Sequence, residues 1–138
     1  MSKNNILIIP LDDRPCTYDF PVKLSKIAGY ETIIPDKNIL GNIFKVGNRE
    51  EVYKIIKENF QSCIGLIIAF DTLLYGGLIP SRRNYDSFEK IKSFLSIIKE
   101  IKKIDKDFKI YANTTIMRMS NNNYNEEEKE YWSEYGEK

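Results

Sequence analysis

The sequence predicts an α/β fold in which four β-α units build a parallel sheet. Short apolar runs alternate along the chain with segments whose apolar residues recur at helical spacing. The most apolar run, residues 63–70, lacks the polar alternation of a half-exposed strand and is typical of a strand covered on both faces. Two architectures satisfy this order: an open doubly wound sheet, or the first half of a (β/α)8 barrel.

Four segments are expected to be strands because each is short, rich in apolar residues and followed by polar residues or a proline. The first of them runs directly into Asp12 and Asp13, and the second is closed by Pro35 and Asp36. Parallel strands need crossover connections, which the intervening helical patterns supply. The expected strands span residues 5–11, 30–34, 63–70 and 108–117.

Four helices are expected after these strands, and each begins near a polar residue that can cap it. Asn48 and Glu51 have the spacing of a capping box. The third helix is long, with an apolar face and a lysine-rich face. The last one carries Tyr131, Trp132 and Tyr135, with little left in the chain to cover them. The expected capping residues are Asp19, Asn48, Asp86 and Asn125.

The composition is that of a soluble globular protein, with 42% apolar and 30% charged residues. Its 138 residues fit a single α/β domain, 1–138, or the N-terminal part of a larger one. The formal net charge of +1 gives no electrostatic basis for a nucleic acid partner. No apolar run is long enough to span a membrane, and no signal peptide is evident, so we expect a cytoplasmic protein.

The chain contains no histidine and only two cysteines. This excludes Ser-His-Asp and Cys-His catalysis, and histidine-based zinc sites, from anything that the chain does alone. No Walker or Rossmann motif is present, and the sequence identifies no cofactor and no metal ligands. Any chemistry must therefore use carboxylates, arginines, lysines, tyrosines, serines or backbone groups.

Polar side chains follow all four predicted strands at the point where each strand ends, and Asp36, after the second strand, is the weakest candidate because a turn also explains it. Asp12, Asp13 and Arg14 follow the first strand, and Asp71 follows the third. The fourth strand leads through Asn113 to Arg118. Because the carboxyl ends of parallel strands meet at one edge of a sheet, we expect these side chains to form a site there.

Two carboxylates across a cleft are the groups that glycoside hydrolysis needs, and they can also ligate magnesium. Asp12 and Asp13 cannot form the pair together, because adjacent residues on a strand point to opposite faces. Asp71 with one of them is the better pair. Nearby arginines would orient a substrate or hold a carboxylate ionised.

Tyr75, Gly76 and Gly77 follow Asp71 and form a second candidate feature. Paired glycines allow positive φ angles and a close approach of a ligand to the backbone. A tight turn explains the same residues, so the motif alone does not establish a binding loop.

Four segments of the chain, in order, resemble an uncharacterised bacterial family, the domain of unknown function 4127. They are Ile8-Ile9-Pro10-Leu11-Asp12-Asp13-Arg14-Pro15 with Tyr18-Asp19-Phe20-Pro21, Asp71-Thr72-Leu73-Leu74-Tyr75-Gly76-Gly77-Leu78-Ile79-Pro80-Ser81-Arg82, Ile116-Met117-Arg118, and Tyr131-Trp132-Ser133-Glu134-Tyr135-Gly136. Members of that family are much longer, so the resemblance implies that this chain corresponds to their N-terminal part. It supplies no reaction. It implies that the site comprises Asp12, Asp13, Arg14, Asp71, Tyr75, Gly76, Gly77, Ser81, Arg82 and Arg118.

The leading hypothesis from the sequence is a carbohydrate-active, hydrolase-like enzyme. Asp71 with Asp12 or Asp13 would be the catalytic pair, while Arg14, Arg82 and Arg118 would orient a small polar substrate. Tyr75, Gly76, Gly77, Ser81 and Asn113 would complete the substrate site.

Two alternatives stay open at the level of sequence. One is a hydrolase or phosphoryl-transfer enzyme that depends on magnesium or manganese, and the other is a non-catalytic ligand-binding or interaction module. Made alone, the chain is expected to expose apolar surface and to self-associate, unless the rest of a longer chain covers it.

Overall fold

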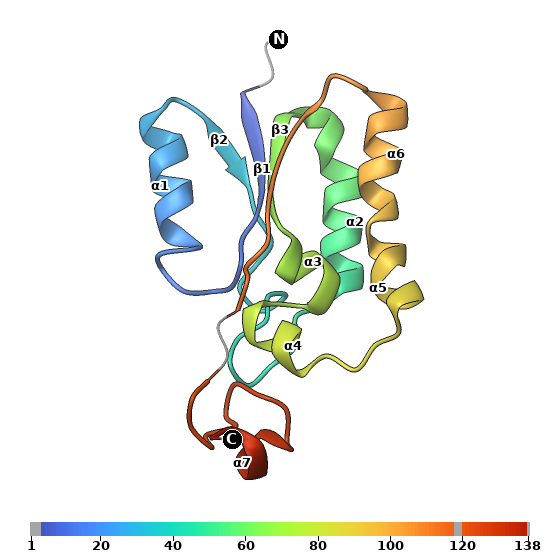
Figure 1. Ribbon diagram of the computed structural model, residues 1–138. Coiled ribbons are helices and arrows are strands. Elements are labelled where there is room, and N and C mark those ends of the chain that lie inside the picture. Colours follow the sequence, from blue (N-terminus) through green and yellow to red (C-terminus); the bar gives the residue numbers. More distant parts are fainter. Residues whose placement is uncertain (1–3, 118–119, 138) are drawn as a thin grey trace.

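The structure is a computed structural model that describes residues 4–117 and 120–137. Its sheet has four strands in the order β2-β1-β3-β4, and all three pairings are parallel (Figure 1). The predicted parallel α/β fold is therefore confirmed. The strands are β1 (Asn5–Ile9), β2 (Glu31–Ile33), β3 (Cys63–Ala69) and β4 (Lys109–Asn113).

The strand order decides between the two predicted architectures. In a (β/α)8 barrel each strand pairs with the next one along the chain, so β2 would lie between β1 and β3. Here β1 lies between β2 and β3, and β2 and β4 form open edges. This is the order of a doubly wound sheet, and the half-barrel alternative is wrong.

Helices lie on both sides of the sheet (Figure 1). Helix α1 (Asp19–Ile27) packs beside β2 on one side, whereas α2 (Arg49–Asn59), α5 (Phe88–Phe94) and α6 (Ser96–Ile104) lie on the other. Two short helices, α3 (Phe70–Tyr75) and α4 (Leu78–Arg83), follow β3 directly at the carboxyl edge of the sheet. A single 3-10 turn, η1 (Phe60–Ser62), leads into β3, and α7 (Trp132–Tyr135) lies near the end of the chain.

The main hydrophobic core lies between the sheet and helices α2 and α6. Leu7 and Leu66 project from neighbouring strands, and Ile56 and Ile101 project from the helices to meet them. All four are fully buried. Burial of each such side chain contributes about 1.5–3 kcal/mol, so this layer supports the strand ends that carry the polar residues.

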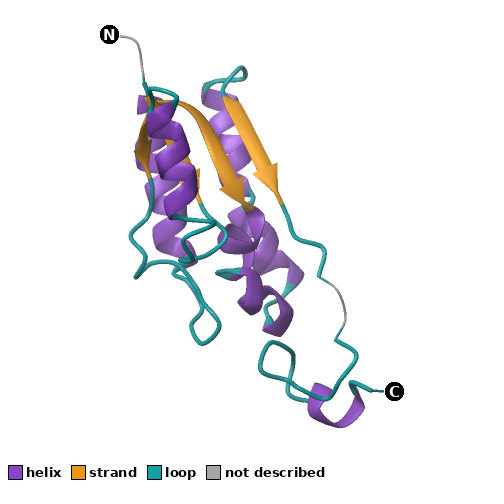
Figure 2. Cartoon of the chain, turned by 90° about the vertical axis from the view of Figure 1, so that its left-hand side faces the viewer, coloured by secondary structure: helices purple, strands orange, loops and turns teal. Residues whose placement is uncertain are grey.

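The opposite side of the sheet is covered less completely. In Figure 2, α1 stands in front of one part of the sheet, and no described helix stands in front of β4. Ile64, Ile67 and Tyr111 are exposed on the strands, and Leu24 and Ile27 are exposed on α1. The exposed apolar surface predicted from the sequence is present on this side.

Within residues 4–117 and 120–137, no helix has the length and apolar character needed to cross a membrane.

The structure confirms one predicted helix cap and corrects three. The side chain of Asn48 accepts the backbone N–H of Glu51, as the capping-box spacing predicts. Asp19 is the first residue of α1 and pairs with Lys37 instead of capping. Ser87, rather than Asp86, caps the third helix, which is divided into α5 and α6 at Leu95.

The helix predicted from Asn125 is also wrong, because its first turn is used for tertiary contacts. Glu127 and Glu128 both bind the guanidinium of Arg82 and lie in a non-helical segment. Only the short α7 forms after them, and Tyr131 and Tyr135 remain exposed as expected.

All four strands are shorter than predicted. Contacts with distant residues explain the ends of two of them, β1 and β4. Strand β1 stops at Ile9 because Pro10 has no N–H to donate, and the hydroxyl of Thr72 binds the carbonyls of Pro10 and Leu11. Strand β4 stops at Asn113, and the N–H of Thr115 donates to the carboxylate of Asp71. Both interruptions turn the chain towards the carboxyl edge of the sheet.

Candidate functional site

The carboxyl ends of β1 and β3 form the topological switch point of the sheet. The chain leaves β1 towards α1 on one side and leaves β3 towards α3 at the sheet edge. Ligands of open α/β sheets bind in the crevice outside such a point, because the diverging connections leave space there. The strand order therefore places the segment that follows β1 where a ligand site is expected.

A hollow of about 440 Å³ lies at this place. Its walls come from the segment after β1, the loop after β2, helix α4 and the C-terminal segment. The charged residues that line it are Asp12, Asp13, Arg14, Arg82 and Glu127, and the apolar ones are Ile43, Phe44, Leu78, Ile79 and Met117. An apolar wall with a few convergent polar groups is typical of a small-molecule site.

Asp12 organises the turn that follows β1. One of its carboxylate oxygens accepts the backbone N–H of Arg14 at 3.2 Å and also the hydroxyl of Thr17. The other oxygen accepts the Nε of Arg14 at 2.8 Å and lies 2.7 Å from its terminal nitrogen. The two residues form a side-on, charge-assisted pair, which fixes the direction in which the turn leaves the strand.

Burial of the Asp12 carboxylate acts to raise its pKa, but the hydrogen bonds from Arg14 and Thr17 outweigh burial, and the pKa lies below its usual value. The same contact raises the pKa of Arg14. Asp12 is therefore ionised at neutral pH, and its two oxygens are already occupied by the protein. This arrangement fits a positioning role better than direct attack on a substrate.

Asp13 is the carboxylate of this turn that stays available. It lines the hollow and is only partly buried. Among the described residues, no hydrogen bond or ion pair engages its side chain. The sequence predicted that one of the two adjacent aspartates serves the site, and the geometry distinguishes them: Asp12 holds the turn, and Asp13 faces the hollow.

Arg82 and Glu127 form the opposite, charged side of the hollow. The guanidinium of Arg82 lies 3.0 Å from a carboxylate oxygen of Glu127 and 3.0 Å from one of Glu128. Its side chain is only 14% exposed. The contact brings the C-terminal segment to the sheet edge and adds a second carboxylate, Glu127, to the hollow that contains Asp13.

The loop of residues 41–47 forms the apolar wall of the hollow. Two of its glycines, Gly41 and Gly47, pack closely against Gly76 and Gly77. The N–H of Gly47 donates to the carbonyl oxygen of Gly76 at 2.8 Å. A Cβ atom built on Gly41 would lie only 1.9 Å from the same oxygen. Gly77 also packs against the Cα of Gly41. The backbones of two distant segments therefore approach as closely as only glycine allows.

The tip of this loop holds an aromatic side chain beside the hollow. The side-chain oxygen of Asn42 accepts the backbone N–H groups of Phe44 and Lys45, at 2.9 and 3.0 Å. This closes a tight turn in which Phe44 remains 94% exposed. A nearly fully exposed phenylalanine that lines a hollow is available to contact a ligand.

The family model described as "Protein of unknown function (DUF4127)" matches residues 6–138 of the chain. The chain belongs to the DUF4127 family. The resemblance drawn from the four sequence segments is thereby confirmed. No curated protein and no solved structure shows a match to this chain.

In this DUF4127 chain, the Tyr75-Gly76-Gly77 segment does not contribute as one unit. Gly76 and Gly77 have positive φ angles of 82° and 135°, as the paired glycines suggested. They pack against the loop of residues 41–47 and do not line the hollow themselves. Tyr75 lines a neighbouring hollow, to which the same loop also contributes.

The structure does not bring the other predicted residues into the main hollow. The hydroxyl of Ser81 donates to the carbonyl of Leu78 within α4. Asn113 is exposed at the end of β4 and does not line the hollow. Arg118 lies outside the described residues. The predicted site residues that the hollow does unite are Asp12, Asp13, Arg14 and Arg82.

Asp71 is buried beneath the site. The residue is only 2% exposed, and its carboxylate accepts the backbone N–H of Thr115 at 3.0 Å. Its own carbonyl accepts the N–H of Gly77. Asp71 does not line the hollow. Its hydrogen bond to Thr115 joins α3 to the segment that follows β4.

We expect Asp71→Asn to be nearly neutral and Asp71→Ala to lower the free energy of unfolding by about 1–3 kcal/mol. Asparagine retains an oxygen that can accept the N–H of Thr115, whereas alanine leaves that group without its partner. Urea denaturation of both variants measures the difference. A folded Asp71→Asn protein that nevertheless loses a measured activity would instead support the catalytic role predicted from the sequence.

Several residues of the site could not be singled out from the sequence. Glu127 and Thr72 act through contacts with residues far away in the chain. Glu127 stands in no recognisable motif, and Thr72, although it follows Asp71 in a family segment, has no residue type that points to this role. Phe44 could have been noticed as an aromatic residue between two glycines in a predicted loop. Among residues 4–117 and 120–137, no three Asp, Glu, Cys or His side chains gather in a way that could hold a metal ion.

Proposed function

We propose that the main hollow binds a small polyhydroxylated molecule such as a sugar, and that the protein hydrolyses its glycosidic bond. Asp13 and Glu127 are the two carboxylates of this proposal, because both line the same hollow. Asp71, the partner predicted from the sequence, does not line it. Glycoside hydrolysis uses two carboxylates that flank the scissile bond, one as acid and the other as base or nucleophile.

The observation that carries the proposal is the free carboxylate of Asp13 beside fixed guanidinium groups. Arg14 is oriented by Asp12, and Arg82 by Glu127 and Glu128, so both can bind substrate hydroxyl groups from defined positions. Glu127 binds Arg82 through one oxygen, and no described residue bonds to the other. Sugars also present apolar C–H faces, which the exposed ring of Phe44 can cover.

The test is a panel of chromogenic glycosides assayed with the wild-type protein and with Asp13→Asn. We expect turnover of at least one glycoside by the wild type and loss of that turnover in Asp13→Asn, with the fold intact by circular dichroism. Asp107→Asn is the matched control, because Asp107 is an exposed aspartate in the turn before β4. Turnover that is equal in Asp13→Asn and wild type would contradict the proposal.

A non-catalytic binding module is the second candidate, and one observation favours it. Two of the three predicted catalytic carboxylates, Asp12 and Asp71, are engaged by the protein's own groups. Under this alternative, sugars would bind to the wild type and more weakly to Asp13→Asn, but no glycoside would be hydrolysed. For the metal-dependent alternative, no specific observation speaks in its favour: among the described residues, no three Asp, Glu, Cys or His side chains gather as metal ligands.

A further inference from the structure

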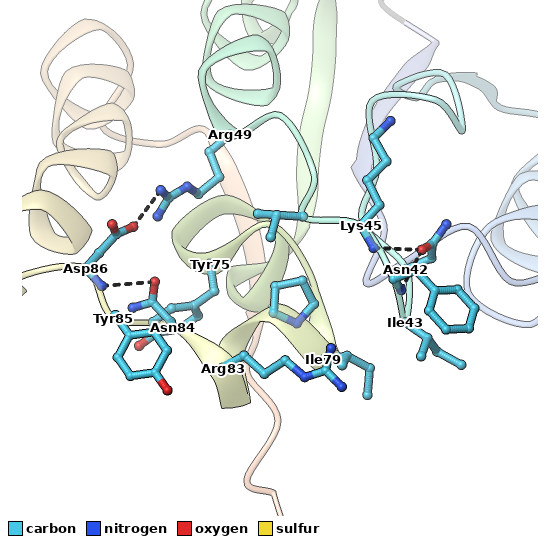
Figure 3. Close-up of a pocket in the computed structure, with 13 residues that line it drawn as sticks. Asn42, Ile43, Lys45, Arg49, Tyr75, Ile79, Arg83, Asn84, Tyr85 and Asp86 are labelled. Atoms are coloured by element: carbon cyan, nitrogen blue, oxygen red, sulfur yellow. Dashed lines mark hydrogen bonds and ion pairs between the residues drawn. The ribbon is translucent and has the colours of Figure 1, made fainter. Parts of the chain in front are cut away.

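A second hollow, of about 290 Å³, lies next to the first (Figure 3). The two hollows share part of their lining, because Asn42, Ile43, Phe44 and Ile79 line both. Tyr75, Pro80 and Tyr85 add apolar and phenolic surface to this second hollow. None of the carboxylates assigned to sugar hydrolysis lines it.

One ion pair of the second hollow is already balanced. Arg49 lies 2.6 Å from a carboxylate oxygen of Asp86 and donates to the carbonyl of Leu74 at 2.8 Å. Figure 3 shows this pair at one side of the hollow, next to Asn84. Asp86 is also bound by Lys90 from outside. This pair therefore offers no net attraction for a negatively charged ligand.

Arg83 differs from Arg49 and from its neighbour Arg82. In the described part of the chain, no carboxylate lies within ion-pair distance of its guanidinium. Among the described residues, its guanidinium makes one long hydrogen bond, 3.3 Å from a terminal nitrogen to the carbonyl of Asn125. Its Nε is buried without a described acceptor, as is that of Arg82, but the terminal nitrogens of Arg82 are neutralised by two glutamates. Figure 3 shows its side chain along the edge of the hollow, with the guanidinium next to Ile79.

Lys45 adds a second cation that the protein does not neutralise. It lines the hollow from the loop side, and its Nζ donates to the carbonyl of Asn38, which carries no charge. No described carboxylate pairs with it. The hollow therefore combines an apolar wall with two cations, Lys45 and Arg83, whose charge is not balanced locally. Half-buried guanidinium groups normally pair with an anionic or hydrogen-bonding partner. This arrangement is therefore suited to binding an anion.

We propose that the second hollow binds the carboxylate or phosphate group of a small ligand, with Arg83 as its main contact. A guanidinium presents paired N–H donors that match the oxygens of both groups. The volume is at the lower end for ligand sites, which limits the ligand to a small molecule. Its apolar part would lie against Tyr85 and Pro80. This site is separate from the proposed sugar site, and either can exist without the other.

The test is a titration of the ¹⁵N-labelled protein with inorganic phosphate and, separately, with acetate at low chloride concentration. We expect saturable shifts of the Asn84 and Tyr85 amide signals at millimolar anion. Arg83→Gln should weaken binding about tenfold or more. Arg83→Lys should weaken it less, because lysine keeps the positive charge but lacks the paired N–H donors of the guanidinium. The tighter of the two anions then indicates whether the ligand carries a phosphate or a carboxylate.

Lys106→Gln is the matched control, because it removes one positive charge from an exposed turn that does not line the hollow. It should bind both anions as the wild type does. Three results would each overturn the proposal: no saturation with either anion, equal binding by wild type and the folded Arg83 variants, or an equal loss in Lys106→Gln. If Arg83→Gln does not fold, Arg83→Lys still decides the outcome.

Discussion

Replacing Gly41 with alanine is expected to lower the free energy of unfolding by about 3 kcal/mol or more. The new Cβ would lie 1.9 Å from the carbonyl oxygen of Gly76, and that atom belongs to the backbone. It cannot rotate away as the end of a side chain could, so the two segments must separate. Separation breaks the hydrogen bond from Gly47 to Gly76 and displaces the apolar wall of the main hollow.

Gly29→Ala is the matched control for this prediction. Gly29 has a φ angle of +83°, but a Cβ there would meet nothing within 4 Å. Alanine at Gly29 therefore tests backbone strain alone, which costs about 1 kcal/mol, whereas alanine at Gly41 tests steric exclusion. Urea denaturation of the two variants gives the comparison. A loss for Gly41→Ala no larger than that for Gly29→Ala would mean that the loop is not seated as described.

Local patterns were enough to predict the fold class, and they also indicated which residues after β1 border the main hollow. The polar-free run of β3 indicated a buried parallel strand. The first strand was expected to run up to Asp12, and β1 ends slightly earlier, at Ile9. Parallel strands align their carboxyl ends, so the expectation that Asp12, Asp13 and Arg14 face a ligand crevice needed only strand polarity. The strand order was not predictable, because no local pattern states which strands become neighbours.

The site residues that were misjudged are those whose surroundings come from distant segments. Gly76 and Gly77 were expected to approach a ligand, but they approach the backbone of Gly41 and Gly47 instead. Both uses require the same absence of a side chain, so the sequence cannot separate them. Likewise, the acidic run that suggested a helix start supplies Glu127, because pairing with a partly buried arginine replaces helix formation.

The second hollow also depends on a feature that local sequence patterns do not predict, namely which arginine is neutralised. Arg82 and Arg83 are adjacent, and although the family resemblance includes only Arg82, no local pattern indicates which of the two is neutralised by carboxylates. In the folded chain, two glutamates neutralise Arg82, whereas Arg83 meets only a carbonyl oxygen. Both arginines contact the same C-terminal segment, and they differ in which of its groups they meet. Charge balance around an arginine is therefore information that only the tertiary structure contains.

Replacing Asp12 with alanine is the second substitution for which we expect a large loss, about 2–3 kcal/mol in the free energy of unfolding. The carboxylate is 9% exposed and accepts hydrogen bonds from the side chain and backbone of Arg14 and from Thr17. Alanine leaves these donors without their partner and frees the turn after β1. Asp13→Ala is the matched control, since no described residue binds that carboxylate, and its effect should stay within about 0.5 kcal/mol.

The pH dependence of the Asp12 contribution follows from the direction of its pKa shift. Burial acts to raise this pKa, but the hydrogen bonds of Arg14 and Thr17 outweigh it, so the folded-state pKa lies below the usual value of 3.8. The unfolded chain therefore takes up the proton first as the pH falls. The stability gained from the ionised carboxylate is complete above that usual value and is lost as the pH drops through the lower, folded-state pKa.

The stability difference between wild type and Asp12→Asn should accordingly stay constant near neutral pH and shrink below pH 3.8. Asparagine cannot ionise, so the free energy of unfolding of Asp12→Asn is the value that the wild type approaches once Asp12 is protonated. Urea denaturation at a series of pH values measures this difference. A difference that does not change with pH would show that the charge of Asp12 does not hold the turn. The orientation of Arg14 towards the hollow would then need another cause.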